Sequence, residues 1–401
     1  MAAQRRITAV LMRGGTSKGV FFHRADLPEE GALRDRVILA AFGGGDPYGR
    51  QIDGLGGATS TTSKVVIVGP PSVPDADVDF TFGQVSVTAP MIDWGGTCGN
   101  LTSAVGPFAI EEGLVRGTDP LTTVRIWQTN TRKHIVARIP TEGGLPQVEG
   151  DYAIDGVPGA GAKIVLEFLS PGGAMTGRLL PTGRPAEALD VPGVGRLDVS
   201  LVDAVNPVVF LRAEALGLTA TEGPERIDGD PALLARIEAV RAHAAVRMGL
   251  AGTPEEATAR SPGVPKIALV AAPAAYVTIS GATVAADAQD VTARIMSMGR
   301  LHRAFAASGA ACTAVAALID GTVVREVVRP GPSGERVIRL GHPSGVMEIG
   351  AAVARAGGEW RADKVITQRT ARRLMEGRVL IPASVWPAPQ PAAAAPAGRR
   401  G

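Results

Sequence analysis

Cysteine is scarce in this chain, with only Cys98 and Cys312 among 401 residues. Two cysteines so far apart exclude a disulfide framework and a metal site built from several thiolates. We therefore expect free thiols in a reducing compartment, the cytoplasm. Long hydrophobic runs are also missing. No segment reaches the roughly 18 apolar residues of a membrane span, and the start MAAQRRITAV is not followed by the apolar stretch of a signal peptide. We expect no membrane partner.

An excess of one charge is lacking too, and aromatic residues are few. The net charge is +2, and aromatic residues make up 4% of the chain. No run of basic residues interleaved with aromatics occurs, so the usual pattern of a nucleic-acid-binding protein is absent. Nor do histidine, cysteine and carboxylate residues cluster at metal-ligand spacing. We expect a small-molecule partner, no nucleic acid and no metal.

The segments that are present predict a mixed α/β protein with two related halves. Short β-rich runs such as SKVVIVG and TTVRIWQTN are separated by Gly, Pro and Asp turns, and residues 99–112 form the one strong helix candidate of the first half. This pattern indicates a sheet wrapped around a helix. The length predicts two domains, and the Pro- and Gly-rich stretch 181–198 is the candidate boundary between them.

The second half repeats this pattern. It contains a helical segment, DPALLARIEAVRAHAAVRMGL, a strand-like PKIALVAAP, and SGAACTAVAALIDGTVV, a small-residue entry into another apolar helix. Aligning Glu112-Gly113 with Asp320-Gly321 places the Cys-Gly-Asn start of the first helix over the stretch that ends at Ser308. This match is a weak indication of an internal duplication. We predict a first domain at 1–190 and a second at 191–385. The last strand of the second domain could return to the first, and residues 386–401 are expected to form a disordered Pro/Ala tail.

The stretch DWGGTCGN places Cys98 at the expected start of the first helix. The unpaired N–H groups of a helix N-terminus favour a thiolate and bind carboxylates, and the neighbouring glycines let a substrate approach the backbone. A buried cysteine in a tight turn explains the same residues equally well. Cys312 lies inside its helix between Ala and Thr, which favours a small packed residue.

Two further stretches carry candidate binding groups. In RQIDGLGGATSTTSK several hydroxyl groups and Lys64 end a Gly-rich loop as a strand begins. A lysine that faces the buried side of a strand would have a lowered pKa suited to acid-base chemistry, whereas one on the other face would simply be solvated. The segment MRGGTSKGVFF lacks the spacing of a phosphate-binding loop, but its backbone suits a carboxylate.

These stretches and several others resemble the PrpF family, the 2-methylaconitate cis-trans isomerases of the methylcitrate cycle of propionate catabolism. The resemblance runs from residue 9 to about 382, and the family also includes 4-oxalomesaconate tautomerases. Phe82–Ser86, Trp127-Gln128 and Arg241–His243 resemble the methylaconitate branch more closely. The matching segments are MRGGTSKGVFF, RQIDGLGGATSTTSK, FGQVSV, DWGGTCGNLTSAVGPFAI, VRIWQTN, RAHAAVRMGL, MSMGRLHRAF, GHPSG and RTARRLMEGRV.

The resemblance implies a diaminopimelate-epimerase-like fold, with two similar α/β domains, each a curved mixed sheet around a central helix. It also implies an active site between the domains and an acid-base pair of Lys64 and Cys98. Asp320, Val205 and Cys312 depart from the family pattern, although none of them belongs to this pair. The substrate-binding candidates are Arg13, Thr16, Ser17, Gln51, Ser63, Gly99, Asn100, Lys266, Ser308 and Gly309.

Isomerising a conjugated polycarboxylate requires a proton to be removed, the charge to be delocalised into a carboxylate, and a proton to be returned. Two proton-transfer groups and an anion-binding cradle suffice, so we expect no cofactor. The sequence leaves open which group is the base, the oligomeric state (a homodimer among the options), and an aconitase-like 2-methylcitrate dehydratase as functional partner. Two alternatives are a non-catalytic accessory protein and a cysteine hydrolase, although no motif places a histidine near Cys98.

Overall fold

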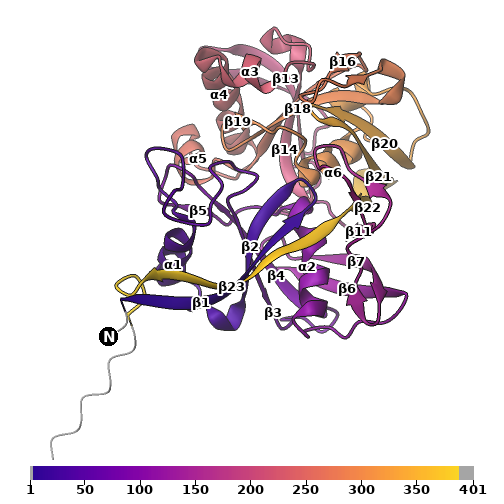
Figure 1. Cartoon of the computed structure of the whole chain (residues 1–401). Coiled ribbons are helices and arrows are strands. Elements are labelled where there is room, and N and C mark those ends of the chain that lie inside the picture. Colours follow the sequence, from indigo (N-terminus) through magenta and orange to yellow (C-terminus); the bar gives the residue numbers. More distant parts are fainter. Residues whose placement is uncertain (1–2, 388–401) are drawn as a thin grey trace, which may run out of the picture.

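A computed structural model describes residues 3–387 of the chain. It has two lobes, each built around one buried helix (Figure 1). The first lobe surrounds α2 (Gly99–Glu111) and the second surrounds α6 (Ala307–Ala316). The predicted mixed α/β class with two central helices is confirmed. Residues 388–401, most of the predicted tail, lie outside the described part. None of the helices in the described part is long and apolar enough to cross a membrane.

The first half of the chain contributes two helices and most of the strands of its lobe. α1 was not predicted, although Val37, Ile38, Ala41 and Phe42 are buried at the spacing of one helix face. The elements are β1 (Gln4–Gly14), β2 (Ser17–His23), α1 (Ala32–Phe42), β3 (Lys64–Gly69), β4 (Val78–Val85), β5 (Ile92–Asp93), α2, β6 (Leu121–Gln128), β7 (Lys133–Glu142), β8 (Leu145–Pro146), β9 (Tyr152–Ala153), β10 (Ala160–Gly161) and β11 (Ile164–Leu169).

The second half adds five helices and the remaining strands. The apolar helix expected from Ser308 onward ends at Ala316, and a separate short helix follows it. The elements are β12 (Glu187–Val191), β13 (Gly195–Ala204), β14 (Asn206–Arg212), α3 (Pro224–Asp228), α4 (Pro231–Arg247), α5 (Pro254–Arg260), β15 (Lys266–Ala271), β16 (Tyr276–Val277), β17 (Thr283–Val284), β18 (Val291–Ser297), β19 (Arg300–Leu301), α6, α7 (Val323–Val327), β20 (Glu335–His342), β21 (Gly345–Ala356), β22 (Glu359–Arg369) and β23 (Ala371–Pro382).

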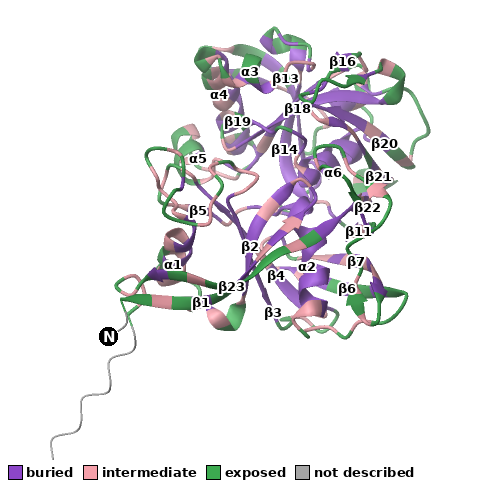
Figure 2. Cartoon of the chain, viewed as in Figure 1, coloured by how far each residue is buried: buried purple, intermediate pink, exposed green. Residues whose placement is uncertain are grey.

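Both central helices are buried around their whole circumference (Figure 2). All residues of α2 from Gly99 to Ile110 and all ten of α6 are buried. A helix that is apolar and small-sided on every face needs a sheet curved around it, because no face can be left to water. This burial fixes each helix against several strands, so the position of its N-terminus is well defined.

The last strands hold the two halves together. β23 pairs antiparallel with β1 over its whole length, from Gln4 opposite Pro382 to Gly14 opposite Ala371. In Figure 1 this last strand crosses back from the second lobe to the first. β11 pairs with β7 on one side and with β22 on the other. The division of the chain near residue 190 stays a prediction, because one sheet continues through both halves.

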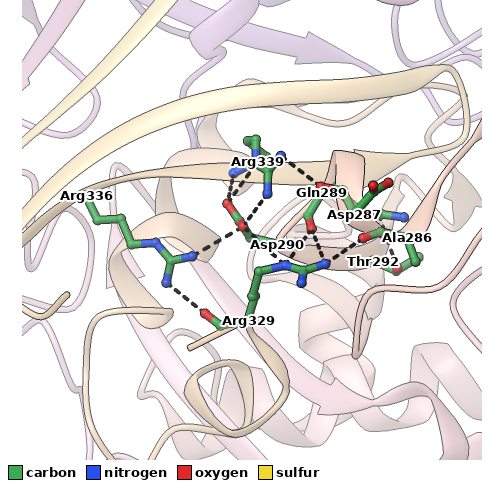
Figure 3. A network of polar contacts seen from close by, with 8 residues as sticks. All are labelled: Ala286, Asp287, Gln289, Asp290, Thr292, Arg329, Arg336 and Arg339. Atoms are coloured by element: carbon green, nitrogen blue, oxygen red, sulfur yellow. Dashed lines mark hydrogen bonds and ion pairs between the residues drawn. The ribbon is translucent and has the colours of Figure 1, made fainter. Parts of the chain in front are cut away.

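Asp290, one residue before β18, ties the second lobe together through three arginines (Figure 3). Its buried carboxylate lies 2.9 Å from Arg339, 3.3 Å from Arg336 and 3.9 Å from Arg329. Burial raises the pKa of this carboxyl, but the hydrogen bonds and charge of Arg339 outweigh burial, so the pKa lies below its usual range. The carboxylate therefore joins β20 and the segment after α7 to the start of β18.

We predict that Asp290→Asn lowers the free energy of unfolding by about 2 kcal/mol, because three guanidinium groups lose their shared counter-charge. The wild-type contribution is present above about pH 4 and is lost as the pH falls through the lowered pKa of the native state. Urea denaturation at pH 7 and pH 3 measures both effects. Asp287→Asn is the control, because that residue binds Arg339 through its carbonyl oxygen. Equal stability of the two variants would contradict the prediction.

Candidate functional site

A pocket with about 470 Å³ of empty space, part of it open to solvent, lies where the N-termini of α2 and α6 meet. Its wall comes from both halves of the chain and combines polar and apolar groups. The lining residues are Ser17, Lys64, Phe82, Gln84, Asp93, Gly96, Thr97, Cys98, Gly99, Asn100, Asn206, Gly263, Val264, Lys266, Ser297, His302, Ala306, Ala307 and Ser308.

The two helix N-termini are in direct contact. Ser308 Oγ donates a hydrogen bond of 3.4 Å to the carbonyl of Thr97. A Cβ atom on Gly99 would lie only 2.9 Å from the backbone nitrogen of Ser308, so glycine is required for this approach. Because each N-terminus carries partial positive charge, the pair forms a cradle for carboxylate groups.

Cys98 is the N-cap of α2, as the sequence predicted. Its sulfur accepts a hydrogen bond from the backbone N–H of Leu101 at 3.4 Å, and its side chain is almost buried in the pocket wall. The preceding residues, Gly95 to Thr97, bring the chain from β5 to the helix, and Asp93 Oδ1 accepts the N–H of Gly95. The thiol is therefore held at the point where the helix field is strongest.

Lys64, the first residue of β3, faces the buried side of its strand. Its Nζ donates to Gln84 Oε1 at 2.5 Å. Gln84 stands opposite Lys64 in the sheet, and its amide nitrogen is fixed by the carbonyls of Ser60 and Ser63. Burial lowers the pKa of Lys64, and nearby Cys98 opposes this effect. The fixed amide orients the amine without supplying a counter-charge.

Lys266 and His302 bring nitrogen atoms from the second half. Burial and the charge of Lys64 lower the pKa of Lys266 to about 8. Burial and the two lysines lower the pKa of His302 to about 3, so the imidazole is neutral. Its Nδ1 accepts the N–H of Ala304 at 3.1 Å, which assigns the hydrogen to Nε2. His302 can therefore donate a hydrogen bond whatever the pH.

Seven of the predicted residues line this pocket together, and five lie outside its wall. Arg13 donates to the carbonyls of Gly15 and Thr370, and Gly309 faces Ile295. Gln51 accepts a hydrogen bond from the hydroxyl of Ser63, the residue before Lys64. Thr16 accepts the Asn100 side-chain amide at 3.0 Å. The residues on the wall are Ser17, Lys64, Cys98, Gly99, Asn100, Lys266 and Ser308.

Several groups at the site were not predicted from the sequence. His302 shares the pocket with Cys98, although no hydrogen bond joins the two side chains among the described residues. Asn206 and Ser297 arrive from strand ends of the second half, where nothing in the local sequence marks them. Arg369, at the end of β22, donates from Nε to Asn100 Oδ1 at 3.1 Å, and its burial lowers its pKa to about 10. It adds positive charge behind the N-terminus of α2.

Residues 4–382 match the family model described as PrpF protein. The chain belongs to the PrpF family. It is 45% identical over 390 residues to a 2-methyl-aconitate isomerase of Shewanella oneidensis, covering 94% of this chain and 98% of that protein. It is 45% identical to a 3-methylitaconate isomerase of Eubacterium barkeri (95% and 98% covered) and 40% identical to a 4-oxalomesaconate tautomerase of Pseudomonas putida (96% and 99%). This PrpF protein is an isomerase.

Solved structures agree with this fold. A methylitaconate-delta-isomerase superposes with a TM-score of 0.74 at 44% identity, covering 97% of this chain and all of that one. A hydroxyproline epimerase from Agrobacterium vitis superposes with a TM-score of 0.54 at 14% identity, covering 95% and 94%. The second likeness shows the fold alone. The expected epimerase-like architecture is confirmed.

The two cysteines should differ sharply in reactivity. We predict that iodoacetamide modifies Cys98 in the folded protein and leaves Cys312 unmodified. Cys312 is fully buried, donates to the carbonyl of Val202, and has its pKa raised by burial. Peptide mass spectrometry gives the modified site, and Cys312→Ala is the matched control, since it should leave the labelling rate unchanged. Labelling of Cys312 in folded protein at the rate of Cys98 would contradict the burial of Cys312, and no labelling of Cys98 would show that the pocket does not expose its thiol.

Proposed function

We propose that this protein isomerises unsaturated polycarboxylates without a cofactor, as a 2-methylaconitate cis-trans isomerase. The observation that supports this best is the joint placement of Lys64 and Cys98 at one pocket whose floor is two helix N-termini. A lowered lysine pKa gives a base, a thiol gives an acid, and the helix ends bind carboxylates. The isomerase relatives at 45% identity support the substrate class.

In the proposed reaction Lys64, as a neutral amine, accepts the acidic γ-proton of the substrate. The electron pair of that C–H bond enters the conjugated system and is delocalised into a carboxylate as a dienolate. In the dienolate the former double bond has single-bond character and rotates. The thiol of Cys98 then returns a proton to the γ-carbon, so the double bond forms again with the opposite geometry. Both groups come from the first half of the chain, and the fixed amide of Gln84 orients the amine.

The substrate carboxylates would be held by uncharged donors. The N–H groups at Gly99-Asn100 and at Ser308-Gly309 lie at the helix N-termini, and His302 offers Nε2–H. Fixed donors of this kind stabilise the charge that develops on a carboxylate during proton removal. Phe82 and Val264 give the pocket an apolar wall on which a methyl group can pack.

We predict that Lys64→Met and Cys98→Ala each reduce turnover of 2-methylaconitate by about a hundredfold or more, the usual effect of losing a general acid or base. An ultraviolet assay of the conjugated acid gives the rates, and proton NMR in deuterated water follows exchange at the γ-carbon. Lys133→Met and Cys312→Ala are the matched controls, because both residues lie away from the pocket.

Circular dichroism and thermal denaturation establish that the variants are folded. Near-wild-type turnover by either pocket variant would exclude that residue from proton transfer. Absence of turnover by the wild-type protein, with any of the acids, would instead favour a non-catalytic accessory role beside an aconitase-like dehydratase of the methylcitrate cycle.

A 4-oxalomesaconate tautomerase is the second candidate. It is supported by the 40% identical relative and by the polar donors Asn206, Ser297 and His302 on the pocket wall, which suit an oxo group. The chemistry and the roles of Lys64 and Cys98 would be the same. The choice therefore depends on whether the apolar or the polar part of the wall meets the substituent that differs between the two acids.

We predict a kcat/KM for 2-methylaconitate or aconitate isomers at least tenfold above that for 4-oxalomesaconate. A tenfold preference corresponds to about 1.4 kcal/mol in transition-state binding, which is the size of a methyl group packed on an apolar wall. Initial rates with both acids at matched enzyme concentration decide it. A preference for the oxo acid would assign the protein to aromatic catabolism and leave the proton-transfer residues in place.

A further inference from the structure

The strands that lead into the pocket follow the same plan in both halves. β1 and β2 form a hairpin that ends at Gly14 opposite Ser17, and β13 and β14 form one that ends at Ala204 opposite Asn206. In each half the next long strand, β3 or β15, pairs parallel with the second strand of the hairpin. Ser17 and Asn206 are therefore equivalent positions.

The register makes Lys64 and Lys266 equivalent as well. Val65 pairs with Val20, so Lys64 lies beside Gly19, two residues beyond Ser17. Lys266 pairs with Val208, two residues beyond Asn206. Each lysine is the first residue of its strand.

The match extends to the residues around the lysines. Gln84 is opposite Lys64, and the pairing of Ala268 with Ile295 places Ser297 opposite Lys266. The N-caps of the central helices are Cys98 and Ala306. Five pairs are thus related by a pseudo-twofold axis, and all ten residues line the pocket: Ser17 and Asn206, Lys64 and Lys266, Gln84 and Ser297, Cys98 and Ala306, Asn100 and Ser308.

Among these five pairs, only Lys64 and Lys266 are the same type of residue. The second half has alanine where the first has its thiol, yet it keeps an amine at the lysine position. Lysine is rare in this chain: of 41 basic residues only six are lysine, at positions 18, 64, 133, 163, 266 and 364. Arginine stays charged under all ordinary conditions, whereas a lysine can lose its proton. Two of six lysines at equivalent pocket positions indicate a site that needs a neutral amine.

We infer that Lys266 is the counterpart of Lys64 across the pseudo-twofold axis, and that repulsion between their two ammonium groups leaves the pair with one proton, so that Lys64 is free to accept the substrate proton. This rests on the proposed function. Two ammonium groups in one enclosed pocket repel each other, so the pair holds its second proton weakly. Neither lysine has a carboxylate within 4 Å among the described residues to relieve that repulsion.

Other charged groups around Lys266 do not replace this effect. Asp93 and Cys98 favour its ammonium form, and Arg241 opposes it. Asp93 already accepts the N–H groups of Gly95 and Gly263, and Arg241 is paired with Glu238 at 2.6 Å. His302 is neutral. The interaction between the two lysines is therefore the one that responds directly to a change at position 266.

The test is the pH dependence of kcat/KM in Lys266→Met and Lys266→Arg. Without the neighbouring charge the pKa of Lys64 rises. The acid limb of the profile, where kcat/KM falls as the pH is lowered, should therefore lie about one unit or more higher in the Met variant than in the wild type. Arginine keeps the charge and should restore the wild-type limb. Lys266→Gln serves as a second uncharged variant. Lys133→Met should leave the limb unchanged, because the half-buried amine of Lys133 donates to the carbonyl of Gly172, away from the pocket.

NMR gives a readout that needs no turnover. Six lysines yield six ε-carbon signals in protein labelled with 13C-lysine, and the signal missing from Lys64→Met identifies Lys64. In the free enzyme its titration midpoint should be about one pH unit higher in Lys266→Met than in the wild type. In Lys266→Arg it should equal the wild-type value.

Two results would overturn the inference. A raised KM with an unshifted acid limb and an unshifted Lys64 titration would make Lys266 a carboxylate-binding residue only. An inactive Lys266→Arg with an unchanged Lys64 titration would make Lys266 itself a proton-transfer group. Full activity of Lys64→Met, by contrast, would defeat the proposed function, while the NMR titration would still report on the lysine pair.

Discussion

The contact between the N-termini of two buried helices is the constraint on which the site depends. Gly99 lies against the backbone of Ser308, and the hydroxyl of Ser308 donates a hydrogen bond to the carbonyl of Thr97. Neither helix can therefore move along its axis without breaking this contact. Because both helices are buried on every face, each sheet fixes the position of its helix end. The positive ends of two helix dipoles are forced together, an arrangement that repels in isolation and is relieved by an anion between them.

The connections between the halves keep that contact in place. β23 returns along the whole of β1, and β11 bridges β7 and β22, so the first lobe is completed by the last residues of the described chain. Arg369, the last residue of β22, extends this dependence to the pocket, because its guanidinium holds the side chain of Asn100. The anion cradle therefore depends on residues more than 250 positions apart in the sequence.

Sequence reasoning located the parts of the site that local chemistry marks. A cysteine among glycines before an apolar run predicts a helix N-cap, and the lysine that ends a hydroxyl-rich loop marks a strand start. Asn206, Ser297 and His302 carry no such mark, because they reach the pocket through strand register and through the β18–β19 hairpin. Alignment of the two central helices in the sequence already indicated that the halves are related. The equivalence of the two lysines, however, appears only once both parallel strand pairings are known.

The charges of the pocket explain why neutral donors line it together with lysines. A polycarboxylate brings negative charge next to Lys64, and that charge alone would favour the ammonium form and remove the base. The proposed mechanism therefore needs the carboxylates to be neutralised by groups other than Lys64. Helix N–H groups, the neutral His302 and Arg369 behind Asn100 can share that task, while Lys266 can pair with a carboxylate and still repel a proton on Lys64. A pocket that bound its substrate with Lys64 alone would hold the acid tightly and leave its proton in place.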